Sequence, residues 1–121
     1  SLAMMEQYLE VEELRARCQA ALLKLLKKAL QEKARAKLAW LDHQKRSLEK
    51  LQDSKGASAI AAKQHKILMQ LQKEQVEIQH LQNLHRAARQ ERKLLLQQQK
   101  EILMMQDSTA KLQEELCTLA G

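Results

Sequence analysis

Proline is absent from this 121-residue chain, and its only glycines are Gly56 and Gly121. Because proline and glycine are the strongest breakers of regular secondary structure, Gly56 is the one interior position where a helix is expected to end. The residues on both sides are mainly leucine, alanine, lysine, glutamine and glutamate, which are all good helix formers. The sequence therefore predicts an all-α fold of two long helices with a turn near Gly56.

The composition favours a coiled coil over a globular domain. Charged residues make up 30% of the chain and apolar residues 45%, but aromatic residues only 2%, so bulky side chains for a rounded core are scarce. Two helices also leave part of their apolar surface in contact with water. We therefore predict a single coiled-coil module over residues 1–121, an antiparallel hairpin that forms a homo-oligomer or binds a partner coiled coil. The opening Ser1 in place of Met suggests an excised fragment.

The predicted boundaries are a helix over residues 2–53, a turn over 54–58 and a helix over 59–119, whose last turns overhang or fold back. In this scheme Gly56 takes the left-handed conformation after the first helix, and Ser58 caps the second. The alternative is one continuous helix in a parallel dimer, because a glycine inside a helix costs only about 1 kcal/mol.

Apolar residues at three- and four-residue steps predict the seam between the helices. The hairpin register would place Leu51 against Ile60 and Leu25 against the 84–86 region. Between residues 20 and 30 the apolar surface is too wide for one neighbour, so a second contact is expected there. The 78, 81, 84 spacing indicates local overwinding near residues 80–85. The residues assigned to the apolar seam are Leu25, Leu41, Leu48, Ile67, Leu71, Ile78, Leu81, Leu95 and Ile102.

The formal net charge is +6, and the basic residues gather in two bands. In the predicted register the two bands lie side by side and attract acidic partners. A solvated helix face, partly neutralised by Glu74 and Glu77, is the simpler interpretation. The first basic band contains Lys24, Lys27, Lys28, Lys33, Arg35 and Lys37, and the second basic band contains Arg86, Arg89, Arg92 and Lys93.

These bands allow three sharper interpretations. Residues 20–30 resemble a basic amphipathic helix that binds anionic membrane or calmodulin, although the same face is needed for the seam. Residues 86–116 partly resemble a basic leucine zipper, but the residues around Asn83 match the DNA-reading motif only roughly. Single-stranded nucleic acid would need stacking aromatic residues, and Tyr8 and Trp40 are the only ones. We therefore predict no specific nucleic-acid partner.

Residues suited to catalysis or cofactor binding are lacking. The four histidines and two cysteines show no zinc-ligand spacing, and no nucleophile stands beside a base. The sequence predicts no enzyme activity, no metal site and no cofactor. Cys18 and Cys117 suit a reducing, cytosolic compartment, and no transmembrane segment or signal peptide is predicted.

Three stretches carry a resemblance to a known family: residues 37–45 around Trp40, residues 71–78, and above all residues 86–96 with their arginines. There, and more loosely from about Ala34 to Leu119, the chain resembles a coiled-coil region of the centrosome-associated protein 350 family. The family carries a longer acidic, proline-containing insert after the glycine, which this chain lacks. The resemblance implies a large scaffold at centrosomes and centrioles that anchors microtubules and recruits partners. It carries over no catalytic or ligand residue.

From these observations we expect a non-enzymatic scaffold or protein-interaction module located in the cytoplasm, the cytoskeleton and the centrosome. Its apolar stripe would contact other centrosomal proteins, and its basic bands would favour acidic partners such as microtubules. The competing interpretation is a basic amphipathic module that binds anionic membrane or calmodulin.

Overall fold

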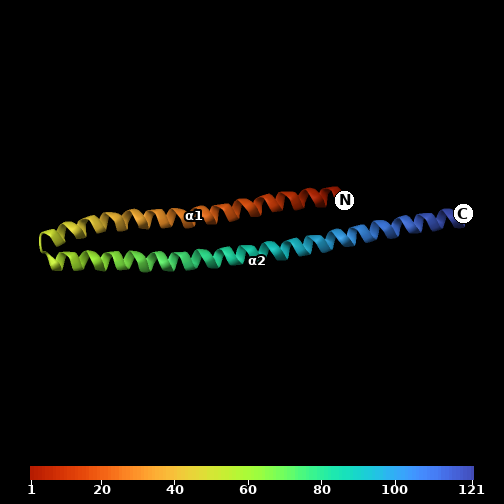
Figure 1. Cartoon of the computed structure of the whole chain (residues 1–121). Helices are drawn as coiled ribbons and strands as arrows, with labels where there is room; N and C mark the ends of the chain where they lie inside the picture. The colour runs from red at the N-terminus through yellow and green to blue at the C-terminus, as the bar shows by residue number, and fades with distance from the viewer. The chain divides into compact units, whose positions relative to one another are not determined.

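The computed structural model describes every residue from Ser1 to Gly121. It contains no strands and two helices, α1 over Leu2–Lys50 and α2 over Ser54–Ala120. The chain reverses at the short link between them, so the helices form a hairpin (Figure 1). The predicted all-α helical hairpin is therefore confirmed, and the alternative of one continuous helix does not hold.

The end of α1 is closed by a backbone motif that uses no glycine. Gln52 adopts a left-handed conformation with φ of 57°, and its N–H donates to the Glu49 carbonyl at 3.0 Å. The next N–H, of Asp53, donates to the Leu48 carbonyl at 2.9 Å. This pair of bonds is the Schellman arrangement, which satisfies carbonyls that a helix end otherwise leaves without partners.

The start of α2 corrects the predicted position of the turn. The Asp53 carboxylate accepts a hydrogen bond from the Gly56 N–H at 2.9 Å, so Asp53, and not Ser58, is the N-cap. Gly56 lies in the first turn of α2 without a positive φ. A Cβ atom there would lie 2.6 Å from Asp53 Oδ2, so glycine leaves room for the capping side chain. The link is therefore residues 51–53, and α2 begins at Ser54.

Contacts between the helices divide into two compact units. The first, here called the turn unit, is Ala20–Asn83. Its interior is formed by Ala34 from α1 and by Ala57, Ile60 and Ile78 from α2, all of which are buried. Alanines let two helix backbones approach closely, while the two isoleucines bury larger apolar side chains. Burying one isoleucine side chain stabilises a fold by roughly 1.5–3 kcal/mol.

The second compact unit, here called the terminal unit, contains Ser1–Gln19 and Leu84–Gly121. Ala16 is its most buried residue, at 1% exposure, with half-buried Leu9 and Leu96 nearby on the same contact face. Every residue from Met104 to Gly121 is exposed, although α2 stays helical to Ala120. The last turns of α2 therefore project as a helix and do not fold back.

The pairing register of the terminal unit also differs from the prediction. Glu6 pairs with Lys100, Glu13 with Arg89, and Gln19 with His85. The predicted register had placed Leu25, not Gln19, opposite the 84–86 region. The cause is the position of the turn. Moving the centre of a hairpin turn by three or four residues shifts each opposing partner by about twice that number, or roughly two helical turns.

Candidate interaction surfaces

The predicted apolar seam falls partly between the helices and partly on the outside. Ile78 is 4% exposed, and Leu41, Leu48, Ile67 and Leu71 are half-buried in the turn unit. The other residues assigned to the seam are exposed and lie outside the contact of α1 with α2. They are Leu25 at 62%, Leu81 at 49%, Leu95 at 54% and Ile102 at 52% exposure.

The reason for this difference is that α1 has two apolar faces. In the turn unit, Leu23, Leu30 and Ala34 are buried or half-buried, whereas Leu22 and Leu25 are exposed. Each residue turns a helix by about 100°, so Leu25 lies nearly half a turn around α1 from Ala34. The second contact expected over residues 20–30 is therefore left open as a free leucine face.

The first basic band lies in the turn unit, where none of its six members forms a salt bridge. Lys27 is half-buried and the other members are exposed. Glu74, expected to neutralise Lys33 and Lys37, shares a shallow groove with both but is bonded to neither. The band is therefore a set of cations without bonded carboxylates, beside the free leucines of the same helix.

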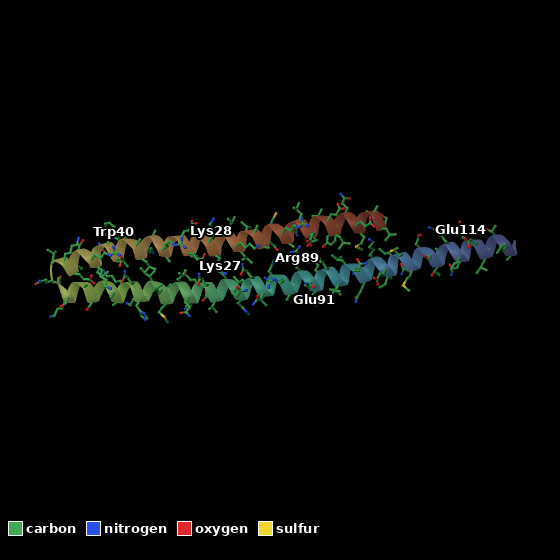
Figure 2. The ribbon with its side chains drawn as sticks, in the orientation of Figure 1. Lys27, Lys28, Trp40, Arg89, Glu91 and Glu114 are labelled. Atoms are coloured by element: carbon green, nitrogen blue, oxygen red, sulfur yellow. The ribbon has the colours of Figure 1, made fainter.

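The second basic band lies in the terminal unit, where most of it is paired. Arg89 binds Glu13 with two nitrogens, Nε at 3.3 Å from Oε2 and Nη2 at Oε1. Arg92 Nη1 lies 2.9 Å from Glu12 Oε2, and Lys93 Nζ lies 3.4 Å from Glu13 Oε2. Figure 2 shows Arg89 between the helices, whereas nearby Glu91 lies on the side of α2 away from α1.

The pairing changes the chemistry of Glu13. Hydrogen bonds from Arg89 hold the pKa of the Glu13 carboxyl below its ordinary value, and the charges of Arg89 and Lys93 act in the same direction. Arg89 and Arg92 of the second basic band therefore face Glu13 and Glu12 of α1. Only Arg86 of the second band has no salt-bridge partner.

A groove of about 820 Å³ runs over this ion cluster in the terminal unit. Leu9 belongs to its apolar part. Its charged lining consists of Glu10, Glu12, Glu13, Arg17, Arg89, Arg92 and Lys93. Since the carboxylates already neutralise most of the cations, the groove has little free charge to attract a ligand. It is better described as the surface of the ionic contact between α1 and α2.

Groups suited to metal binding or catalysis are not assembled. No three histidine, cysteine, aspartate or glutamate side chains lie close enough to hold a metal ion, and both cysteines are free and exposed. His43 lies beside Trp40, with ring centroids 6.0 Å apart, and the Trp40 ring is exposed on the outer side of α1 (Figure 2). Neither helix contains a stretch apolar and long enough to cross a bilayer.

The chain was compared with known protein families, curated proteins and solved structures. No protein-family model and no solved structure matches the chain. The chain is 45% identical over 116 residues to a curated mouse (Mus musculus) protein, "Centrosome-associated protein 350". The alignment spans 96% of this chain but only 4% of that relative. Identity at this level along nearly the whole chain reflects common ancestry, and it confirms the resemblance found in the sequence. This chain is therefore a homologue of a short region of centrosome-associated protein 350.

Proposed function

We propose that this chain is a non-enzymatic coiled-coil scaffold module of a cytoplasmic, centrosomal protein, and that it binds partner proteins through apolar faces left free by the hairpin. The observation that carries the proposal is the free leucine face of α1 in the turn unit. Leu22 and Leu25 are 64% and 62% exposed on a helix whose opposite face is already packed against α2.

Several features support a binding role for this face. Large exposed leucines at three-residue spacing are what one helix offers to another, because they fill the gaps between side chains of a neighbouring helix. Exposed apolar clusters on a protein surface often mark protein-protein contacts. The relative's name supplies the cellular setting, since that protein is associated with the centrosome.

Recruitment in cells tests the proposal. The chain fused to a fluorescent reporter should concentrate at centrosomes, and the Leu22→Glu plus Leu25→Glu variant should be diffuse. The matched control is Met69→Glu plus Val76→Glu, which adds the same charge to two exposed apolar residues of α2 in the turn unit. The control should stay at centrosomes. The proposal would be contradicted if the unsubstituted chain were diffuse in the cell. It would also be contradicted if the leucine variant and the control variant were recruited to centrosomes equally.

The first basic band extends the proposal to acidic partners such as the tails of tubulin on microtubules. Its members have no bonded carboxylates in the hairpin, so they keep their charge for an external anionic surface. Attraction of this kind weakens as salt shortens the screening length from about 30 Å at 0.01 M to about 8 Å at 0.15 M.

Co-pelleting with microtubules across a salt series measures this attraction. The unsubstituted chain should pellet at low salt and be released as the salt rises. Substituting Lys24, Lys28 and Lys33 by Gln should abolish pelleting at low salt. Substituting Lys55, Lys63 and Lys66 by Gln removes the same charge elsewhere in the turn unit and should have a much smaller effect. Co-pelleting that does not decrease as the salt concentration rises would show that the first basic band does not bind microtubules by charge.

One observation favours a second candidate function, binding to anionic membrane or calmodulin. Leu22, Leu25 and Leu26 remain exposed in the hairpin, beside the exposed Lys24 and Lys28. This combination is what basic amphipathic helices present to lipid headgroups. Flotation with vesicles rich in phosphatidylserine distinguishes the candidates. Flotation that Leu22→Glu abolishes would support the membrane candidate, and a chain that stays at the bottom would exclude it.

A further inference from the structure

The last part of α2 carries a regular apolar ladder that the hairpin does not use. Its residues recur at alternating three- and four-residue steps, the first and fourth positions of a heptad. Leu95 and Gln98 extend the same spacing upstream, so the pattern covers more than three heptads, the length typical of a coiled coil. The C-terminal ladder consists of Ile102, Met105, Thr109, Leu112, Leu116 and Leu119, all of which are exposed.

This ladder faces away from α1. Within the terminal unit α2 meets α1 through Leu96, Lys100 and Leu103, which are half-buried. At about 100° per residue, the six residues of the C-terminal ladder lie on average nearly half a turn around the helix from that contact. A second helix can therefore lie on the ladder without displacing α1.

A helix on the α1 side of α2 has no apolar surface to follow beyond Leu103. The contact face continues there as Asp107, Lys111 and Glu114, and the first two form a salt bridge of 3.3 Å. This polar face is suited to water and not to packing. The C-terminal ladder is the only apolar side of the last turns of α2. A helix that packs on the ladder must therefore lie on the side of α2 away from α1.

The side chains that flank the ladder fit a second copy in parallel orientation. In a parallel pair in register, Glu101 of one copy lies beside Gln106 of the other, and Ser108 lies beside Gln113, so no like charges meet. The antiparallel register that covers the whole ladder sets Leu95 against Leu119, and it places Glu101 beside Glu115. Two such repulsive pairs would form in each antiparallel dimer.

The polar positions of the ladder point to the same arrangement. In a parallel pair Gln98 meets Gln98, whose amide offers both a donor and an acceptor, whereas the antiparallel register sets Gln98 against Leu116. The Thr109 hydroxyl already donates to the Met105 carbonyl at 2.9 Å, so its methyl group can be buried without losing a hydrogen bond. The β-branched Ile102 and Thr109 at first positions, with Leu112 at a fourth position, favour two strands.

We propose that residues 95–119 pair with the same residues of a second copy as a parallel, in-register, two-stranded coiled coil. The inference rests on the proposed coiled-coil module and adds to it the identity of one partner, the face it uses and its direction. It leaves the free leucine face of α1 in the turn unit available for other proteins.

Molar mass in solution tests the pairing. Sedimentation equilibrium should give the mass of two chains for the unsubstituted protein and of one chain for Leu112→Lys. Met104→Lys is the matched control and should remain a dimer, because Met104 is an exposed apolar residue of the same helix that lies outside the ladder. Circular dichroism should show the same high helix content in all three proteins. A single-chain mass for the unsubstituted protein, or a dimer that survives Leu112→Lys, overturns the proposal.

Crosslinking tests direction and register. In a background with Cys18→Ser and Cys117→Ser, Ile102→Cys and Leu116→Cys should each form a disulfide between two identical chains, because a disulfide needs Cα atoms within about 7 Å. Ala110→Cys, on the outer side of the pair, should not. Failure of both ladder variants to crosslink with themselves overturns the parallel register. Centrosomal recruitment of a monomeric Leu112→Lys chain would show that the proposed function stands independently of this pairing.

Discussion

Arg89 of α2 donates hydrogen bonds to both carboxylate oxygens of Glu13 on α1. Two-pronged bonds of this kind hold arginine and carboxylate in one relative orientation and are stronger than a single contact. Arg17 and Lys93 also approach Glu13, at 3.6 Å and 3.4 Å. Glu13 thus gathers three cations around one carboxylate and, together with the Glu12–Arg92 and Glu6–Lys100 pairs, sets the register of the terminal unit.

The lowered pKa of Glu13 makes the stability of the hairpin depend on pH. Arg89 favours the ionised form of the Glu13 carboxyl in the folded chain. The Glu13–Arg89 pair therefore contributes fully to the free energy of unfolding at a pH above the pKa that Glu13 has in the unfolded chain. This contribution is lost as the pH falls through the lower pKa that Glu13 has in the folded chain. The free energy of unfolding, measured with urea, should therefore fall on acidification. Glu13→Gln should reduce this fall, whereas Glu91→Gln, at an exposed residue with no salt bridge, should leave it unchanged.

The cap of α2 predicts different effects for two neighbouring substitutions. Asp53→Ala removes the side chain that accepts from the Gly56 N–H, so it should lower the free energy of unfolding by about 1 kcal/mol. Ser58→Ala should change it little or raise it slightly, because Ser58 lies inside α2, where alanine is the better helix former. A larger loss at Ser58 than at Asp53 would contradict the position of the turn.

The left-handed conformation of Gln52 predicts a stabilising substitution to glycine. A side chain at positive φ is strained, and glycine relieves that strain, so Gln52→Gly should raise the free energy of unfolding by up to about 1 kcal/mol. Gln72→Gly provides the comparison, because it makes the same change in the middle of α2 and should cost about 1 kcal/mol. Urea unfolding of both variants measures this difference in sign.

The packing of the turn unit predicts a large effect at Ile78 and a small one at Val76. Ile78 is 4% exposed, so Ile78→Ala should lower the free energy of unfolding by about 2–4 kcal/mol through lost burial and the cavity left behind. Val76→Ala removes a side chain that is 65% exposed and should change it by less than about 0.5 kcal/mol. Equal losses at the two positions would show that the contact face of α2 is assigned to the wrong residues.

The helices were predictable from the sequence because their cause is local. Without proline, and with glycine at only one interior position, nothing interrupts the backbone hydrogen bonds of α1 or α2. The position of the turn was harder to predict. Gly56 was assigned the left-handed position by its preference, but Gln52 occupies that position and Gly56 provides space for Asp53. Asp53 itself was the missed signal, because aspartate is among the preferred N-cap residues.

The contact face was predicted in part because periodicity finds an apolar stripe without identifying what covers it. On α2 the ladder through Leu95 and Ile102 is more regular than the true contact face, which includes Glu74 and Gln82. The sequence gives no direct sign that a regular leucine stripe lies outside the hairpin while charged and amide side chains lie against α1. The exposed residues assigned to the seam are thus real apolar surface whose partner is not α1.

The small buried residues of the hairpin have a consequence for partner choice. Ala16 in the terminal unit, and Ala34 and Ala57 in the turn unit, occupy positions where a longer side chain would separate the backbones. A foreign helix bearing leucine at such a position would not fit the gap that alanine fills. The contact between α1 and α2 is therefore specific to the two helices of this chain. Other helices can bind only through the exposed leucines outside that contact.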